Sequence, residues 1–177
     1  MLTLEPSLVP GLLQTRAYMT ALFECGADYL TPDVRIDNYV RLRLDRQKRL
    51  AGARPLKLHA VVDEAASCRM AGGPHVMREQ LAHLLVIGAQ EHITLQVIPF
   101  VVGPYGTMSG GIMIIRYPDP EDAPNGYVEH RGGGVWLENE KDVELLTSEF
   151  NGAAASALPP AATAELIRRR IEELEGQ

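Results

Sequence analysis

Cysteine and aromatic residues are scarce in this chain of 177 residues. Only Cys25 and Cys68 occur, too few for a disulfide framework, and a reduced, cytoplasmic setting is the simplest interpretation. Aromatic residues make up 6 % of the chain, so the core must rest on Leu, Val, Ile, Ala and Met. No apolar run is long enough to cross a membrane, and no charged leader followed by an apolar block indicates a signal peptide. We expect a globular protein without membrane attachment.

An excess of positive charge is also missing. The chain holds 17 Lys and Arg against 23 Asp and Glu, a net charge of −6. Because binding to phosphates needs a positive field, we expect no direct binding of nucleic acid by this chain. Its five histidines match neither an HxxxH nor an HExxH spacing, so we expect no metal and no cofactor.

The length and the order of patterns predict a single domain over residues 1–177. An N-terminal arm and helices occupy 1–52, a mixed sheet core occupies 53–138, and C-terminal helices occupy 139–177. The expected fold class is α+β (or α/β). It has N-terminal helices, a central βαβ unit extended by a β-meander, and a C-terminal helical pair.

The run from Glu5 to Thr15 predicts an extended apolar arm rather than a helix. Pro10 would break a helix, so the arm turns at Pro10-Gly11 and enters a helix near Thr15. An arm this apolar must pack on something. A second, longer helix is expected to begin at the capping residue Thr31 and to end at about Leu50.

Alternation and helical spacing then place the remaining elements. A strand over Leu56–Val62, a short helical turn over Asp63–Met70, a helix over Pro74–Ala89 and a strand over Ile93–Phe100 predict a parallel βαβ unit. Further strands and helices follow. They are strands over Gly111–Tyr117, Tyr127–His130 and Val135–Leu137, the last two joined at Gly132-Gly133-Gly134, and helices from Asn139 and after Pro159-Pro160.

Basic residues gather between residues 35 and 57, which hold eight of the 17 Lys and Arg. One interpretation is a basic surface for an acidic partner, with Arg41, Arg46 and Arg49 as the partner-binding candidates. The alternative is the solvated face of an amphipathic helix, in which two aspartates dilute the charge.

A ligand-binding corner is expected where the first strand of the βαβ unit ends, because ligands gather at the carboxyl ends of strands in α/β folds. Asp63 and Glu64 lie at that end, Arg69 follows closely, and Tyr105 lies in a Gly-rich loop after the second strand. His130 is the remaining ligand-binding candidate. In the alternative interpretation, Asp63 caps the short helix and Glu64 pairs with Arg69. No catalytic residue is assigned.

Several segments together resemble a known family. The chain is similar to the C-terminal domain of unknown function in actinobacterial Xre-type helix-turn-helix regulators, often described as antitoxin-like. The resemblance covers nearly the whole chain. The matching segments are EPSLVPGLLQTRAY at 5–18, VDEAASCRM at 62–70, GGPHVMREQLAHLL at 72–85, ITLQVIPF at 93–100 and VWLENEKDVELLTSEF at 135–150.

The resemblance implies a cytoplasmic regulatory domain that follows a DNA-binding head and works with a small acidic partner protein. It brings no catalytic residues. The 177 residues leave no room for that head before the first matching segment, so we expect no DNA binding by this chain. The chain also departs from the family at Tyr105, where a histidine is expected, and at Cys68, where a bulkier residue is usual.

The leading expectation is therefore a non-catalytic regulatory module that binds a partner protein or a small-molecule ligand, with homodimer formation as a further option. The alternative is a small stand-alone enzyme of actinobacterial specialised metabolism, with a pocket near Asp63, Glu64 and Tyr105. A third option is a competitor that dimerises with full-length regulators through the apolar arm.

Overall fold

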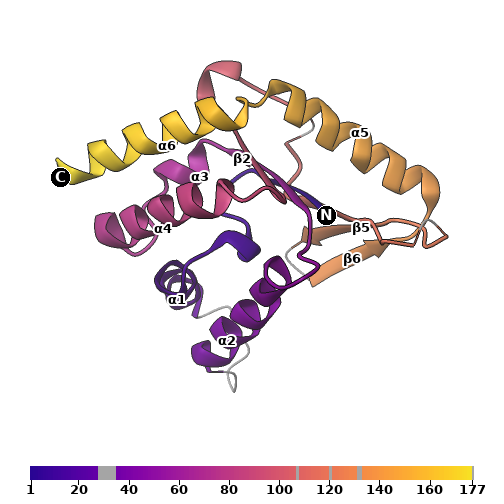
Figure 1. Ribbon diagram of the computed structural model, residues 1–177, viewed down its shortest axis with the longest axis horizontal. Helices are drawn as coiled ribbons and strands as arrows, with labels where there is room; N and C mark the ends of the chain where they lie inside the picture. Colours follow the sequence, from indigo (N-terminus) through magenta and orange to yellow (C-terminus); the bar gives the residue numbers. More distant parts are fainter. Residues whose placement is uncertain (28–34, 107, 120, 131–132, 177) are drawn as a thin grey trace.

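The computed structural model describes residues 1–27, 35–106, 108–119, 121–130 and 133–176. In these residues six strands form one mixed sheet in the order β3-β2-β1-β4-β5-β6 (Figure 1). The strands are β1 (Leu2–Glu5), β2 (Leu58–Asp63), β3 (Ile93–Ile98), β4 (Ile112–Ile115), β5 (Asn125–His130) and β6 (Gly133–Leu137).

Helices join and cover these strands, which confirms the α+β class. They are α1 (Arg16–Cys25), α2 (Ile36–Gln47), α3 (Ala65–Cys68), α4 (Gly73–Gly88), α5 (Glu140–Ser156) and α6 (Pro160–Glu175), with short 3-10 turns η1 (Gly11–Leu13), η3 (Lys48–Leu50) and η4 (Phe100–Val102). No described helix has the length and apolar character that a membrane crossing requires.

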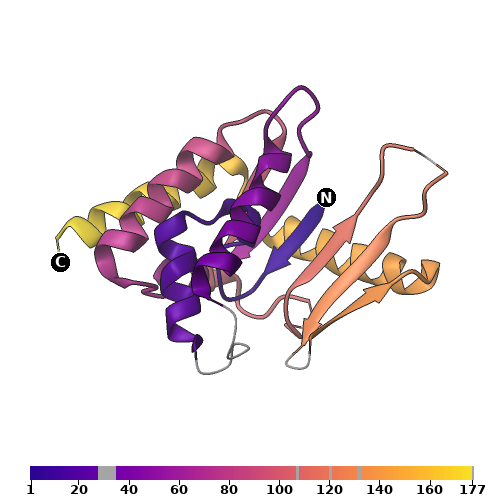
Figure 2. The ribbon, with the colours of Figure 1, turned by 90° about the horizontal axis from the view of Figure 1, so that it is seen from below.

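The parallel half of the sheet follows the predicted βαβ logic. β2 is parallel to β3, as expected, and also to β1. Both crossovers step in the same direction across the sheet, so crossovers of one hand place their helices on one face. Accordingly, α1, α2 and α4 lie on one side of the sheet and α5 lies on the other (Figures 1 and 2).

β1 is the element that the sequence did not reveal. Its four residues end at Glu5, directly before Pro6, and are too few for an alternation pattern. They nevertheless lie at the centre of the sheet between β2 and β4. The arm that follows is as predicted: the chain turns at η1, and the Thr15 side chain accepts a hydrogen bond from Tyr18 N–H to cap α1. Val9 and Leu13 are buried in the chain's own core.

Two apolar cores lie on the two faces of the sheet. The first joins β2 and β3 to α1, α4 and α6 around residues such as Met77 and Leu81. The second lies under α5, where Phe150 packs near Ile112 and Ile114. The C-terminal helices α5 and α6 confirm the predicted pair, and Asn139 caps α5 by accepting from Lys141 N–H.

The bounds of the second helix and of the glycine hairpin were also predicted. The expected start of the second helix at Thr31 lies outside the described residues, whereas its expected end agrees with η3, which ends at Leu50. β5 and β6 pair antiparallel, as the predicted hairpin requires, but Gly133 and Gly134 pair with β5 as part of β6 and do not belong to the turn. Gly134 is needed for a different reason: a Cβ there would overlap the ring of Tyr127. Gly132 lies outside the described residues.

The two edges of the sheet differ. The outer edge of β3 is covered, because Val97 N–H donates to Thr163 Oγ1 over 3.0 Å and Leu158 N–H donates to Val97 O over 2.9 Å. β6 is the other edge and pairs with no further described strand. The face of β4, β5 and β6 turned away from α5 carries no helix in Figure 2.

Candidate functional site

The structure brings together two residues of the predicted acidic corner. Asp63 ends β2 and is 8 % exposed, and Tyr105, in the loop after η4, is 6 % exposed. Burial first, and then the Asp63 carboxylate, raise the pKa of the Tyr105 hydroxyl. That hydroxyl is buried and has no partner at hydrogen-bond geometry among the described residues. The two polar groups therefore face each other inside the fold rather than a solvent-filled cleft.

The carboxylates of this corner are used to hold backbone groups. Asp63 Oδ1 accepts from Ala65 N–H over 2.8 Å at the start of α3, as the capping alternative predicted. The predicted pairing of Glu64 with Arg69 is wrong, because Glu64 Oε2 accepts from Phe100 N–H over 2.7 Å instead. Phe100 begins η4, where a backbone N–H has no acceptor within its own helix. Glu64 thus ties the ends of β2 and β3 together.

The other two candidates lie apart from this pair. Arg69 is exposed after α3, and His130 is exposed at the end of β5. β1 and β4 separate His130 from Asp63, and three strand spacings amount to about 14 Å. The five candidates therefore do not form one compact site. Among the residues that the structure describes, no group of three or more His, Cys, Asp and Glu could hold a metal ion.

The partner-binding candidates are all on the surface. Arg41 and Arg46 are exposed on α2, and Arg49 is exposed on η3. The acidic residue Asp45 is neutralised by Lys48 at 2.7 Å, whereas Arg46 and Arg49 form no ion pair with any described residue. The exposed side of α2 and η3 is thus both a solvated helix face and a surface with unneutralised positive charge.

Arg43, which the sequence did not single out, joins α2 to the N-terminal arm and to α1. It is half-buried, its Nη1 donates to Gln14 Oε1 over 2.5 Å, and its guanidinium lies 4.6 Å from the centre of the Phe23 ring. Burial lowers the pKa of Arg43, and the charges of Glu129 and Glu5 oppose that change. Arg43 therefore lies near acidic residues of β5 and β1.

Glu5 is the second group that sequence reasoning missed. Burial, followed by the charge of Glu129, raises its pKa to about 7, while a hydrogen bond with Thr3 and the charge of Arg43 act in the opposite direction. Glu5, Arg43 and Glu129 form a charged cluster. No short-range sequence pattern could reveal it, since its three members come from β1, α2 and β5.

Beside Glu5, Arg43 and Glu129, the sheet carries a row of large side chains that leads to the exposed Trp136. The strand register places Met113, Tyr127 and Trp136 in one cross-strand row. We name these three residues the aromatic strip. The row continues through Thr3 to Ala60 of the core under α1 and α4, so the strip lies on the same side of the sheet as α2.

The aromatic strip is open to solvent at its outer end. Trp136, the single tryptophan of the chain, is 55 % exposed, and its ring centre lies 4.9 Å from that of Tyr127. Figure 2 shows α2 beside the uncovered strands on this side of the sheet. A basic helix and an uncovered aromatic surface are therefore neighbours, linked by Arg43 and Glu129.

Comparison with known proteins bears on the family alone. No curated protein and no solved structure matches the chain. The model of one family, described as "Domain of unknown function (DUF5753)", matches residues 1–169. Since this match spans almost the entire chain, the protein belongs to the DUF5753 family.

Proposed function

We propose that this domain is a non-catalytic regulatory module that binds a small acidic partner protein, as its resemblance to Xre-type regulators implies. The observation that carries the proposal is the basic surface of α2 and η3 lying beside the aromatic strip. Arg, Tyr and Trp are enriched among the residues that dominate the binding energy of protein interfaces. The exposed arginines of α2 and η3 and the exposed Trp136, which packs on the half-buried Tyr127, lie on one side of the sheet and support a protein partner.

The distribution of charge favours an acidic partner. Residues 35–57 hold eight basic and two acidic residues, so the rest of the chain holds nine basic and twenty-one acidic residues. A partner of negative charge is attracted to residues 35–57 and repelled by most of the remaining surface, which restricts how it can dock. A positive segment on an otherwise negative molecule thus supports oriented binding of an acidic protein.

The burial of the acidic corner supports binding over catalysis. An enzyme acting near Asp63 and Tyr105 has to bring substrate to their polar atoms, yet both residues are more than nine-tenths buried and the Asp63 carboxylate is held by a backbone N–H. The apolar arm offers no free surface for dimerisation at Val9 and Leu13, which are 2 % and 0 % exposed.

The test is affinity capture from an extract of the source cells, with identification of the captured protein. The wild type is compared with Arg46→Glu/Arg49→Glu and with the control Arg168→Glu/Arg169→Glu, which changes the net charge equally on the exposed face of α6. We expect the wild type and the control to capture an acidic protein whose binding weakens steeply with salt, and the α2 variant to lose it. Equal capture by both variants, or capture that nuclease abolishes, would contradict the proposal.

A further inference from the structure

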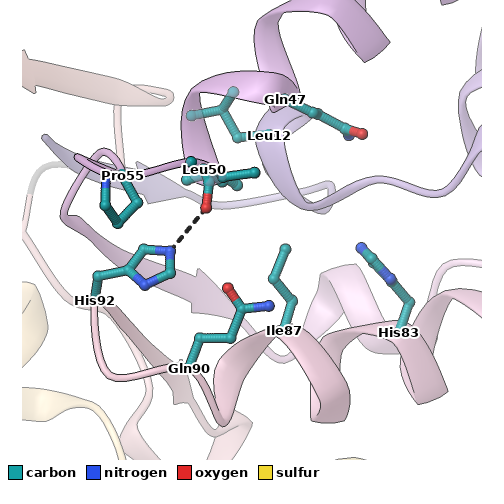
Figure 3. Close-up of a pocket in the computed structure, with 10 residues that line it drawn as sticks. Leu12, Gln47, Leu50, Pro55, His83, Ile87, Gln90 and His92 are labelled. Atoms are coloured by element: carbon teal, nitrogen blue, oxygen red, sulfur yellow. Dashed lines mark hydrogen bonds between the residues drawn. The ribbon is translucent and has the colours of Figure 1, made fainter.

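A second feature lies beside the C-terminal end of α2, on the side of that helix that faces α4. A cavity of about 390 Å³ lies between η1, the end of α2 and α4. Figure 3 shows side chains from all of these elements converging on it. The lining residues are Leu12, Gln47, Leu50, Ala51, Gly52, Pro55, His83, Ile87, Gln90 and His92.

The two histidines of the cavity, His83 and His92, bring ring nitrogens to its wall as hydrogen-bonding groups. Burial lowers the pKa of His83, and this imidazole makes no hydrogen bond with a described residue. His92 Nε2 lies 3.0 Å from Leu50 O, and because a carbonyl only accepts, Nε2 carries the proton. The second ring nitrogen, Nδ1, accepts a hydrogen bond whenever it carries no proton. The half-buried ring of His83 can therefore hydrogen-bond to a molecule in the cavity.

A glutamine adds a further acceptor. Both donors of Gln47 are used, because Nε2 donates to Gly11 O over 3.0 Å and to Gln14 O over 2.7 Å. Its Oε1 accepts no hydrogen bond from a described group. Apart from Gln90, the remaining wall is apolar, from side chains such as Leu12, Leu50 and Ile87. Among the described residues, no Asp, Glu, Lys or Arg lines the cavity.

We propose that this cavity binds a small uncharged molecule with an apolar body and at least one hydrogen-bond donor and acceptor, such as a phenol or an indole. The cavity volume lies within the range of about 300 to 1,000 Å³ that is usual for ligand sites. A carboxylate or an ammonium is disfavoured, since the walls offer no counter-charge for its desolvation. This proposal goes beyond the partner-binding function and stands whether or not an acidic protein binds.

The experiment follows the imidazole resonances of ¹⁵N-labelled full-length protein during titration with indole and phenol. Benzoate and benzylamine, which have similar ring sizes, are the charged counterparts. We expect saturable shifts of His83 and His92 with the uncharged probes, at dissociation constants of about 1 mM or tighter, and binding at least tenfold weaker for the charged ones. His75, exposed on the same helix, is the internal control and stays unshifted.

Two variants locate the site. Ile87→Trp fills the cavity and is expected to abolish binding, and His83→Phe keeps the wall while removing its polar atoms and is expected to weaken binding about tenfold. The control His75→Ala leaves binding unchanged. His83→Phe decides the matter if Ile87→Trp does not fold. The absence of saturable shifts with both uncharged probes, equal binding of the charged probes, or unchanged affinity in His83→Phe would overturn the proposal.

Discussion

A single carboxyl group connects the stability of this domain to pH. Glu5 is the last residue of the central strand β1 and lies near Glu129 and Arg43 in a largely buried position. Its pKa is near 7 in the folded protein, against 4.5 for a free glutamate. Between these values the folded state holds a proton that the unfolded state has released. The contribution of Glu5 to the free energy of unfolding is therefore fully present below pH 4.5. It decreases as the pH rises and is lost above about pH 7.

Glu5→Gln is expected to remove this dependence. The variant keeps the size of the side chain without the buried charge, so at pH 8 it should unfold with a free energy about 1 to 3 kcal/mol higher than the wild type, since one pKa unit corresponds to about 1.4 kcal/mol. Urea unfolding at pH 5, 6, 7 and 8 measures the slope. The exposed control Glu24→Gln should keep the slope of the wild type, and a slope that persists in Glu5→Gln would assign it to another group.

The ring of Tyr105 is expected to stabilise the fold, whereas its hydroxyl is not. Its hydroxyl is buried without a partner at hydrogen-bond geometry, so removing the oxygen leaves no lost bond in the folded state. Tyr105→Phe should unfold within about 1 kcal/mol of the wild type, or be more stable, whereas Tyr105→Ala should lose about 3 to 5 kcal/mol of ring packing. Chemical denaturation of both variants checks this. A large loss in Tyr105→Phe would mean that the hydroxyl bonds to Asp63 in solution.

At the scale of elements, one glutamine of α4 holds the N-terminal arm in place. Gln80 is fully buried; its Oε1 accepts from Thr15 N–H over 2.7 Å and its Nε2 donates to Leu13 O over 2.8 Å. Leu13 is the last residue of η1 and Thr15 directly precedes α1, so both backbone groups lie at the junction of these two elements. One side chain thus fixes the path from the central strand to the first helix.

Gln80→Ala should therefore cost about 2 to 4 kcal/mol, because it leaves two buried backbone groups without partners. Amide hydrogen exchange should also speed up at Thr15 more than at residues of β3, since the loss is local to the arm. Glu79→Ala, an exposed neighbour on the same helix, is the control and should change stability by less than about 0.5 kcal/mol. Uniform loss of protection across the sheet would contradict a local role.

The elements with strong periodicity were predictable, and the contacts between distant elements were not. The alternation over Leu56–Val62 and Ile93–Phe100 identified β2 and β3, and their parallel pairing brought the residues after each strand to one edge, so Asp63 and Tyr105 meet. β1 was not predicted, because four residues before a proline are too few to show the alternation of a strand. Arg43 resembled its basic neighbours on α2, and only the packing of α2 near β1 and β5 sets it apart.

At the scale of the whole molecule, the helices cover the sheet unevenly. α1, α2 and α4 cover the parallel half on one face, α5 covers the other face, and β4, β5 and β6 keep one side bare (Figure 2). Exposed apolar patches on single proteins usually indicate an interaction site. Here the bare side adjoins the one segment with excess positive charge, so hydrophobic and electrostatic attraction act on the same partner.

The single tryptophan reports on that surface without labelling. In the free protein, Trp136 should emit close to the wavelength of tryptophan in water and be quenched efficiently by acrylamide, because it is 55 % exposed. Adding the captured acidic partner should shift the emission to the blue and reduce quenching, since docking on the aromatic strip removes water from the indole. Titration of the partner measures the affinity from the same signal.

Trp136→Ala separates binding from folding. The substitution removes a mostly exposed ring, so the unfolding free energy should fall by no more than about 1 kcal/mol, whereas partner affinity, measured by calorimetry, should fall at least tenfold, as expected for an aromatic residue at the centre of an interface. Leu145→Ala, 69 % exposed on α5 at the opposite side of the sheet, is the matched control and should leave affinity unchanged. An affinity lost in Leu145→Ala and retained in Trp136→Ala would move the partner to the α5 side of the sheet.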